Sequence, residues 1–308
     1  MSAGSGIGTR PAAGQVGDEA RALLRGAVDL DCRCAPTGAG GLPTHREAAE
    51  EAAALGLAGL VFRDDGYGTE PFAALLSETR LAVEGQAVFG SVTLNGVSGG
   101  LNLHAAEHCL MLHGRVVVMP TTSAENHLRA LRWPGRGAAK GHPVKALRAI
   151  DRLGRVLPEA REVIEVVAER DGVLDGGYLH VAEILPLFRA AAEMGLRRMV
   201  VSDPMRRNAA KPQDIAELVA LGARIALPPD AAAMTPELLA ELSGNAAGSL
   251  ILGLGARAEG RGLLPRYAAA LRFWGEAGLS PDAIRNGVTN VPATLLGLSQ
   301  RADCKEPA

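Results

Sequence analysis

Short apolar segments alternate with helical segments along most of this chain, and this alternation constrains the fold more than any other feature. The apolar, mostly β-rich runs lie at 26–34, 58–64, 86–95, 115–121, 173–179, 197–203, 223–228 and 249–255. Most are followed by a segment with apolar residues at helical spacing, as at 44–56, 103–113, 183–195, 213–222 and 263–278. Eight such units predict parallel strands with crossover helices, hence an α/β fold of the (β/α)8 TIM-barrel type. A doubly wound open sheet remains the alternative, because periodicity alone does not separate the two.

The length of 308 residues and the 47% hydrophobic content fit one barrel-sized domain, which we place at 26–298. Residues 1–20 are rich in Gly, Ser and Ala and predict a disordered N-terminal tail, and 299–308 a polar C-terminal tail. Within the domain, 133–172 is interpreted as an insertion, with a Gly/Pro/Arg-rich loop followed by a helix. Loops of that length in a barrel often cover the active face.

Composition narrows the classes of partner. A net charge of -2 and only 3% aromatic residues argue against nucleic acid and against an anionic membrane surface. No apolar stretch is long enough to cross a bilayer and no signal peptide is seen, so we expect a soluble cytoplasmic protein. Cys32 and Cys34 lie two apart on a predicted strand and share a face, where packing is a simpler explanation than a disulfide.

Several motifs resemble a known group of enzymes. Residues 28–34 (VDLDCRC) resemble the Asp-x-His-x-His opening strand of amidohydrolase-type barrels. Leu-Asn at 94–95, Gly-Gly-Leu-Asn at 99–102 and Met-Pro-Thr at 119–121 resemble an uncharacterised family of amidohydrolase-like barrels, and 290–298 resembles their terminal "NPA-x-LLGL" helix. The resemblance covers 26–298. It implies one or two divalent metals at the carboxyl ends of the strands, held mostly by histidines.

The positions that match those ligand motifs carry other residues. The first strand has Asp31 and Arg33 in place of two histidines, and the second has Arg63 and Asp65 where the relatives resemble "LKDH". The later motifs, "TGH", "THP" and "SDLG", are replaced by Gly-Gly-Tyr at 176–178, Ser-Asp-Pro at 202–204 and Gly-Leu-Gly at 253–255. A guanidinium offers no lone pair to a cation. Asp31, Asp65 and Asp203 alone suit a hard ion, but two arginines in the same ring oppose it, so we expect no metal and no cofactor.

The replacements predict a charge-balanced pocket. Strand alternation puts Asp29, Asp31 and Arg33 on one face, with Leu30 and Cys32 on the other. Similarly, Arg63 and Asp65 share a face. Because buried charges are costly unless paired, we expect arginine–aspartate bridges where the metal would have been.

Two functional hypotheses follow. In the first, the protein is a metal-independent enzyme of acid/base type, or a binder, acting on a small anionic or carbonyl compound. Arg33 and Arg63 would clamp a carboxylate or a developing oxyanion. The catalytic candidates are then the carboxylates with one phenol: Asp65 or Asp203 as general base, Tyr178 as proton donor, and Asp31 beside them.

In the second hypothesis, the same charges form a self-satisfied ionic plug in a catalytically inactive relative. Such a protein would be a structural or accessory partner, either as a homo-oligomer or paired with an active paralogue. The first hypothesis is favoured, because in a site without a function apolar residues could have replaced the charged ones.

Weaker candidates lie in the loops after the predicted strands, where barrel sites are built. Asn95, Asn102 and Thr121 are candidate substrate-binding residues, and the Gly-Gly pair at 99–100 either cradles a ligand or makes a tight turn. His127 and His180 are further candidates for substrate binding or acid/base work, with surface or capping roles as the alternative. The basic residues of 136–155 either form a solvated face or attract an anionic substrate.

Overall fold

Eight parallel strands lie side by side in chain order in the computed structural model, which describes residues 13–79, 85–131, 145–229, 235–246, 248–255 and 262–298. Each strand falls inside one of the predicted apolar runs or within one residue of it: β1 Val28–Arg33, β2 Gly59–Arg63, β3 Ala87–Thr93, β4 Gly114–Val118, β5 Val173–Asp175, β6 Met199–Ser202, β7 Arg224–Leu227 and β8 Leu250–Leu252. The α/β prediction is therefore confirmed at the level of elements and their order.

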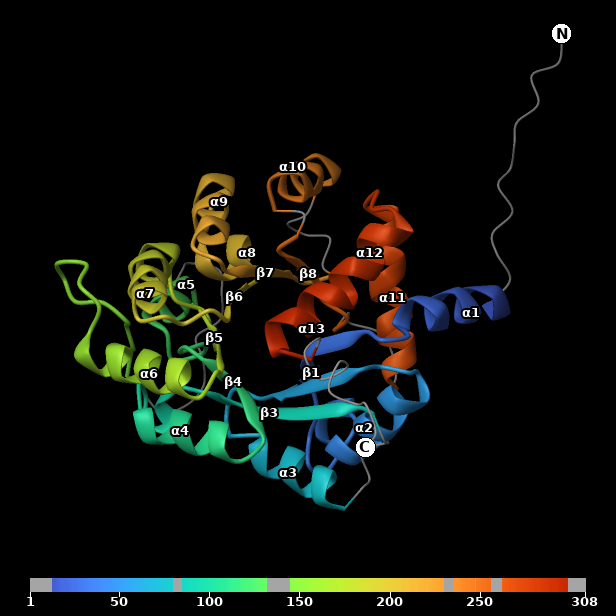
Figure 1. The fold of residues 1–308 in the computed structure, drawn as a ribbon, viewed down its shortest axis with the longest axis horizontal. Coiled ribbons are helices and arrows are strands. Elements are labelled where there is room, and N and C mark those ends of the chain that lie inside the picture. The colour runs from blue at the N-terminus through green and yellow to red at the C-terminus, as the bar shows by residue number, and fades with distance from the viewer. Residues whose placement is uncertain are drawn as a thin grey trace, which may run out of the picture.

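The sheet curls into a half-barrel with helices on its outer side (Figure 1). Parallel pairing is continuous from β1 to β8, but within the described residues no ladder joins β8 back to β1. A closed (β/α)8 barrel therefore remains a prediction. The consecutive strand order differs from that of a doubly wound sheet, in which the order reverses at a switch point.

Helices connect successive strands as the periodicity predicted. The second helix begins at a capping box, in which Thr44 accepts from the amide of Glu47 and the Glu47 side chain accepts from the amide of Thr44. The helices are α1 Ala13–Leu24, α2 His45–Ala54, α3 Glu70–Glu78, α4 Leu103–Met111, α5 Glu125–Leu131, α6 Pro158–Glu169, α7 Val181–Glu193, α8 Pro204–Asn208, α9 Pro212–Ala220, α10 Pro236–Ala246, α11 Leu263–Glu276, α12 Pro281–Val288 and α13 Asn290–Leu296, with 3-10 turns η1 Ala39–Gly41 and η2 Gly96–Ser98.

Two apolar clusters hold the layers together. The larger lies between the outer face of the sheet and the helices, and includes Phe62, Phe188 and Trp274. The smaller lies inside the curl, where inward-facing residues such as Val61 and Val118 pack with α13. Figure 1 shows α13 within the curve of the sheet. Because the inner cluster and α13 occupy the interior, the polar side chains near the carboxyl ends of the strands are confined to one end of the molecule.

Two predicted boundaries need correction. Helix α1 begins at Ala13, inside the segment predicted as a disordered tail, and it is ordered because Ala20 and Leu24 are buried and the helix packs against α11 and α12. Helix α6 packs on α4, α7 and β5, so it is the ordinary crossover helix between β4 and β5 and not part of an insertion. The Gly/Pro-rich stretch at 133–135 and the tail at 299–308 lie outside the described residues.

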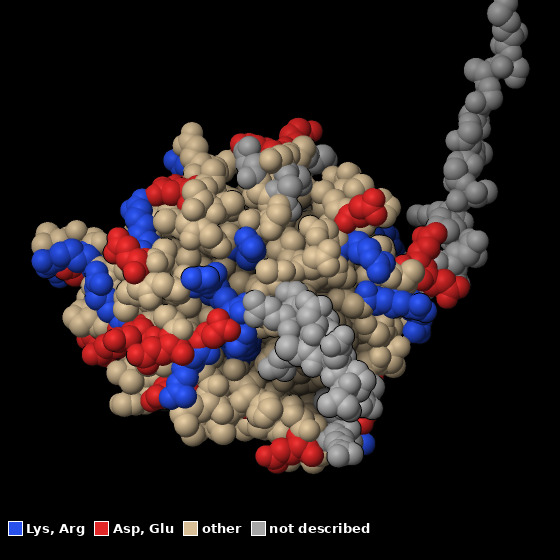
Figure 2. All heavy atoms as spheres, in the orientation of Figure 1, with Lys and Arg blue, Asp and Glu red and all other residues tan. Residues whose placement is uncertain are grey.

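The surface carries both signs of charge. On the face seen in Figure 2, groups of basic and acidic side chains are scattered among uncharged residues, which cover most of the visible area. Among the helices that the structure describes, none is both long enough and apolar enough to cross a membrane.

Candidate functional site

A cavity of about 140 Å³ opens beside the carboxyl ends of the strands. One wall is charged and polar, with residues from β1, β2, the loops after β4 and β5, the end of β6 and helix α8: Asp29, Asp31, Arg33, Arg63, Thr121, Tyr178, Ser202, Asp203, Arg206 and Arg207. The other wall is apolar and comes mainly from β7, β8 and the residues after them: Ala226, Leu227, Pro228, Pro229, Ile251, Leu252 and Leu254. The position at the carboxyl ends is where barrel folds build their sites.

A bulge in β1 alters the predicted alternation of side chains. The pairing with β2 is regular at Val28 and Asp29, shifts between Asp29 and Cys32, and resumes with Arg33 opposite Arg63. Consequently Val28 and Leu30 pack with the inner cluster, and Asp29 accepts a 2.9 Å hydrogen bond from the hydroxyl of Tyr267 on α11. The bulge interrupts the alternation from which the shared face of Asp29, Asp31 and Arg33 was predicted, although all three residues line the same cavity.

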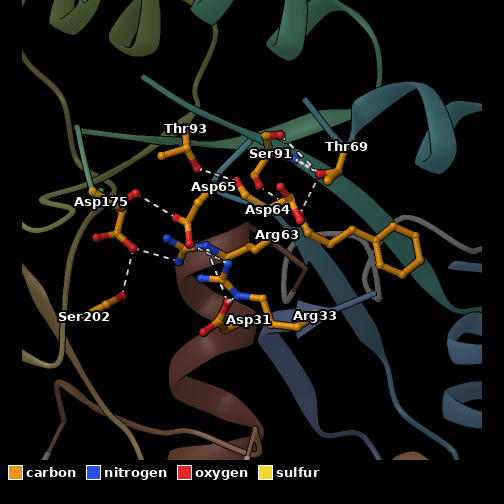
Figure 3. Close-up of polar contacts among 12 residues, drawn as sticks. Asp31, Arg33, Arg63, Asp64, Asp65, Thr69, Ser91, Thr93, Asp175 and Ser202 are labelled. Carbon is orange, nitrogen blue, oxygen red and sulfur yellow. Dashed lines mark hydrogen bonds and ion pairs between the residues drawn. The ribbon is translucent and has the colours of Figure 1, made fainter. Parts of the chain in front are cut away.

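The deepest ion pair joins two strands that are far apart in the sequence. Arg63, at the end of β2, donates from Nη1 to Oδ2 of Asp175 over 2.7 Å, and Ser202 donates to the same oxygen over 2.8 Å (Figure 3). Arg63 is 8% exposed and Asp175 fully buried. Burial works to lower the pKa of Arg63, but the charges of Asp175 and Asp31 outweigh it and the net shift is upward. The guanidinium is therefore a permanent cation inside the protein.

One atom of this guanidinium has no hydrogen-bond partner. Nε of Arg63 is buried, and no described side chain or backbone group bonds to it. Oδ1 of Asp31 is 3.8 Å away from this atom, beyond hydrogen-bond distance. An unsatisfied buried donor costs about 1 to 3 kcal/mol, and such an atom in a native structure calls for an explanation.

A second ion pair lies nearer the mouth. Arg33 donates to Asp31 over 2.6 Å and to Asp65 over 3.1 Å. Thr121 donates to the other oxygen of Asp65 over 2.7 Å and itself accepts from Asn95. Burial alone would raise the pKa of Asp65, but Arg33 and the bond from Thr121 more than offset it and lower this pKa. Asp65 is thus an ionised and weakly basic carboxylate that orients Arg33.

The loop after β2 is held by the neighbouring strand. Thr93 donates to the carbonyl of Asp64, and Asn95 donates to the carbonyl of Asp65. The Asn95 side chain also accepts from the amides of Thr121 and Ser123 and is 1% exposed. Asn95 therefore fixes three loops relative to one another, which is a positioning role within the site.

A third group of charges faces the cavity from the β5 and β6 ends. Asp203 accepts from Arg206 over 2.6 Å, and Arg207 Nε lies 3.6 Å away from the same oxygen. The guanidinium carbon of Arg207 is 4.4 Å from the ring centroid of Tyr178, a cation–π contact. Asp203 has a left-handed backbone (φ 55°), an uncommon conformation for a non-glycine residue and one found more often at functional sites.

Tyr178 is set in place by a tight turn after β5. Gly177 has a φ of +59°, and a Cβ at this position would lie 2.2 Å from the carbonyl oxygen of Met119, so only glycine fits. Burial, and then the charge of Asp65, raise the pKa of Tyr178. Its hydroxyl therefore stays protonated at neutral pH, as a proton donor requires.

Asp29 is a buried acid at the inner wall of the cavity. Burial raises its pKa from 3.8 to about 6, although the bonds from the Asp31 amide and Tyr267 act in the other direction. Desolvation disfavours the charged form of a carboxyl group. Asp29 consequently changes its charge within the range of pH in which most proteins are handled.

Three predicted binding residues lie outside this cluster or at its edge. Asn102 caps α4, with its side-chain oxygen accepting from the amides of His104 and Ala105. His180 caps α7 through Nδ1, which accepts from the amide of Ala182. Both have the capping geometry typical of helix N-termini, and neither lines the cavity. The ring of His127 lies 5.4 Å from that of Tyr178, so it contacts the site from α5.

Four residues of the site were missed in the sequence. Arg206 and Arg207 follow the Ser-Asp-Pro motif, but nothing in the pattern shows that one turn of helix returns them to Asp203. Ser202 lies within that motif but was not taken as a site residue. Asp175 had a detectable signal, since it is the one acid in the apolar run 173–179. A lone carboxylate at the end of a buried strand indicates a buried partner.

The site does not fit the metal centre that the family resemblance implies. In the described ranges, no group of three or more His, Cys, Asp or Glu side chains is arranged to hold a metal ion. The aspartates near the first two strands are engaged by guanidinium groups, with Arg33 bonded to Asp31 and Asp65, and Arg63 bonded to Asp175. A guanidinium neither ligates a cation nor tolerates one nearby. The chemistry available to these residues is anion binding, hydrogen bonding and proton transfer.

Comparisons with known proteins agree with this fold. Residues 26–226 match a family described as "Family of unknown function (DUF6282)". No curated protein matches the chain. Among solved structures, an amidohydrolase from Pseudomonas aeruginosa is 9% identical, with 91% of this chain and 98% of that chain covered and a TM-score of 0.55. A lactonase from Listeria monocytogenes is 13% identical, with 89% and 95% covered and a TM-score of 0.52. The predicted amidohydrolase-like resemblance is confirmed, and at these identities it concerns the fold.

Proposed function

The chain belongs to the DUF6282 family, whose function is unknown, and we propose that it binds and transforms a small anionic or carbonyl compound without a metal ion. In this proposal the half-barrel is the described part of an amidohydrolase-like (β/α)8 barrel. The observation that carries the proposal is Arg63, a buried guanidinium at the wall of a cavity, which Asp175 holds in place while its Nε has no hydrogen-bond partner in the described chain. A ligand oxygen would satisfy that donor.

The roles follow from the geometry. Arg33 and Arg63 donate to a carboxylate, or to the oxygen on which negative charge develops during reaction. Tyr178, protonated because its pKa is raised, is the proton donor. Asp203 is the better-placed general base, because it lines the cavity whereas Asp65 does not. The reaction is then of acid/base type, as in a hydrolase, lyase or cyclase.

Binding is the first step to test. Protein dialysed against a chelator, with its metal content measured, is screened by thermal shift against small carboxylates, lactones and cyclic amides. We expect at least one acid to stabilise the wild type. Arg63→Lys keeps a cation beside Asp175 but removes the planar guanidinium group with its Nε donor. This variant should lose the ligand-induced increase in melting temperature. Arg115→Lys, at the opposite end of the sheet, is the matched control and should keep it.

Two results would overturn the proposal. One is a stoichiometric metal whose removal abolishes activity or ligand binding. The other is the absence of any stabilising compound in the wild type together with full stability of Arg63→Lys, which would show that Nε has no function.

The inactive-relative hypothesis has one observation in its favour. Apart from Asp29, which bonds to Tyr267, the described charges of the site are balanced, with an aspartate within 4 Å of each arginine: Arg33 with Asp31 and Asp65, Arg63 with Asp175, and Arg206 and Arg207 with Asp203. A self-neutral plug of this kind suits a structural or accessory subunit, self-associated or paired with an active paralogue. In that case, replacing the buried pair Arg63 and Asp175 together by apolar residues of similar volume should leave stability unchanged or raise it.

A further inference from the structure

Asp31 occupies the place that a ligand carboxylate would take. Its Oδ1 lies 2.6 Å from Nε of Arg33 and 3.8 Å from Nε of Arg63, so one carboxylate oxygen faces both guanidinium groups (Figure 3). The contact with Arg33 is a good hydrogen bond, while that with Arg63 is too long to be one. The Asp31 carboxylate therefore lies between the two guanidinium groups without forming a hydrogen bond to Nε of Arg63.

The two aspartates that contact Arg63 differ in how firmly they are held. Asp175 is fully buried and accepts from Arg63, Ser202 and the amide of Gly177. The Asp31 side chain is 54% exposed and lies in the bulge of β1. An exposed ion pair is worth only about 0.2 to 1 kcal/mol, so Asp31 can rotate into solvent at small cost. Removing Asp175 from Arg63 would leave a buried charge unpaired.

Charge counting limits what can replace Asp31. With Asp31 turned away, Arg33 is still paired with Asp65 and Arg63 with Asp175. The balanced set of the site has then lost one negative charge. Counted over all four arginines, Arg33, Arg63, Arg206 and Arg207, one incoming carboxylate restores the balance, whereas a second would leave the set with one excess negative charge. The pocket thus suits a monoanion.

The apolar wall of the cavity indicates the chemistry of the part of the ligand that does not carry the carboxylate. Leu227, Ile251, Leu252 and Leu254 line the cavity and are each at most 2% exposed, so they are fixed by packing. A cavity of about 140 Å³ has room for roughly ten water-sized atoms. An apolar body placed there is removed from water, which stabilises the complex by about 25 cal/mol per Å² of apolar surface buried.

We infer that the ligand is a small monocarboxylate with a compact apolar body, and that Asp31 is an internal competitor for its carboxylate. The carboxylate lies between Arg33 and Arg63 and accepts from Nε of Arg63, and the body lies against the β7–β8 wall. As the ligand enters, the side chain of Asp31 rotates away from the two arginines and into solvent. This inference rests on the proposed function. It adds the chemical class of the ligand and a residue, Asp31, whose competition lowers the affinity for that ligand.

Calorimetric titration with isovalerate tests the inference. Wild type is compared with Asp31→Asn and Asp31→Ala, in which the competitor loses its charge or its whole carboxylate. Isovalerate should bind both variants about 1.5- to fivefold more tightly than wild type, the range expected for release of an exposed ion pair. Glu50→Gln removes one negative charge at an exposed pair on α2 and is the matched control, with unchanged affinity.

Three analogues examine the ligand class with the same proteins. Isovaleramide lacks the charge, succinate carries a second one, and 3-hydroxybutyrate makes the body polar. Each should bind wild type at least tenfold more weakly than isovalerate.

The outcomes separate this inference from the proposed function. If carboxylates bind in a manner that depends on Arg63, but the Asp31 variants bind more weakly than wild type, Asp31 is a contributor and not a competitor. If succinate or 3-hydroxybutyrate binds as well as isovalerate, the ligand class is wrong while the anion site stands. If no carboxylate binds wild type, Asp31→Asn or Asp31→Ala, both proposals fail together.

Discussion

Two pairs of arginines at opposite ends of the sheet look alike and differ in one respect. At the amino ends of the strands, Arg115 and Arg198 share Asp171, which is 64% exposed, much as Arg33 and Arg63 share Asp31 at the carboxyl ends. There, however, the guanidinium groups also donate to the last carbonyls of α13: Arg198 to Thr294 and Leu295, and Arg115 to Leu296.

The difference lies in how the donors are used. Cations at a helix C-terminus satisfy its free carbonyls and its dipole, so the amino-end pair has a structural role. A hollow of about 230 Å³ lies beside it, and the guanidinium group of Arg198 on its wall donates to Asp171 and to carbonyls of α13. What distinguishes the carboxyl end is a buried donor, Nε of Arg63, that nothing in the described ranges satisfies. A buried donor without a partner at the wall of a cavity is therefore the feature on which the proposed binding site rests.

The largest expected effect breaks the buried pair. Asp175→Ala leaves Arg63 buried without its carboxylate, which should destabilise the protein by about 3 to 5 kcal/mol in urea unfolding at pH 7. The double variant Asp175→Ala/Arg63→Met removes both charges and should recover much of this loss. A loss below about 1 kcal/mol in the single variant would show that Arg63 is hydrated and not buried as described.

Asp29→Asn should increase stability, and only above acidic pH. The pKa of Asp29 is raised to about 6 in the folded protein from 3.8, so its stabilising contribution is complete below pH 3.8 and is lost as the pH rises through 6. Asparagine cannot ionise, so the variant should gain about 1 to 3 kcal/mol over wild type at pH 7.5. Denaturant unfolding between pH 4 and pH 8 measures the difference. A gain that does not change with pH would contradict the assignment.

At the amino end, Arg198→Met should destabilise without affecting ligands. The variant loses bonds to two carbonyls of α13 and to Asp171, which we expect to cost about 1 to 2 kcal/mol. Carboxylate binding at the other end should be unchanged. Weakened binding in this variant would mean that the two ends are coupled and would undermine the comparison.

Arg33→Met should have the smallest effect on stability and a large one on binding. Its side chain is 33% exposed, and pairs of this kind contribute less than about 1 kcal/mol. Thermal unfolding should change little, while the isovalerate shift should disappear because one of the two clamping donors is missing. If Arg33→Met still binds isovalerate as wild type does, the carboxylate is bound by Arg63 without Arg33.

The order of elements could be predicted because it depends on local pattern. Apolar runs and helical spacing located all eight strands, and the Thr-x-x-Glu sequence marked the start of α2. The replaced motifs led to Arg33, Arg63, Asp65 and Asp203, which the structure brings to one end of the sheet because parallel strands end together. Their functional roles remain predictions. The long-range pair of Arg63 with Asp175, 112 residues away, could not be predicted from either segment alone.

By itself, the sequence determined which residue types stand at the ends of the strands, among them the charged Arg33, Arg63 and Asp203. Only the tertiary structure decided which charges meet: the bulge in β1 turned Asp29 toward Tyr267, and the approach of β2 to β5 and β6 gave Arg63 a buried partner while leaving its Nε unused. The physical reason is that the spacing of apolar residues in the sequence indicates only which face of each strand is buried. Pairing geometry and desolvation depend on neighbours that lie far away in the chain.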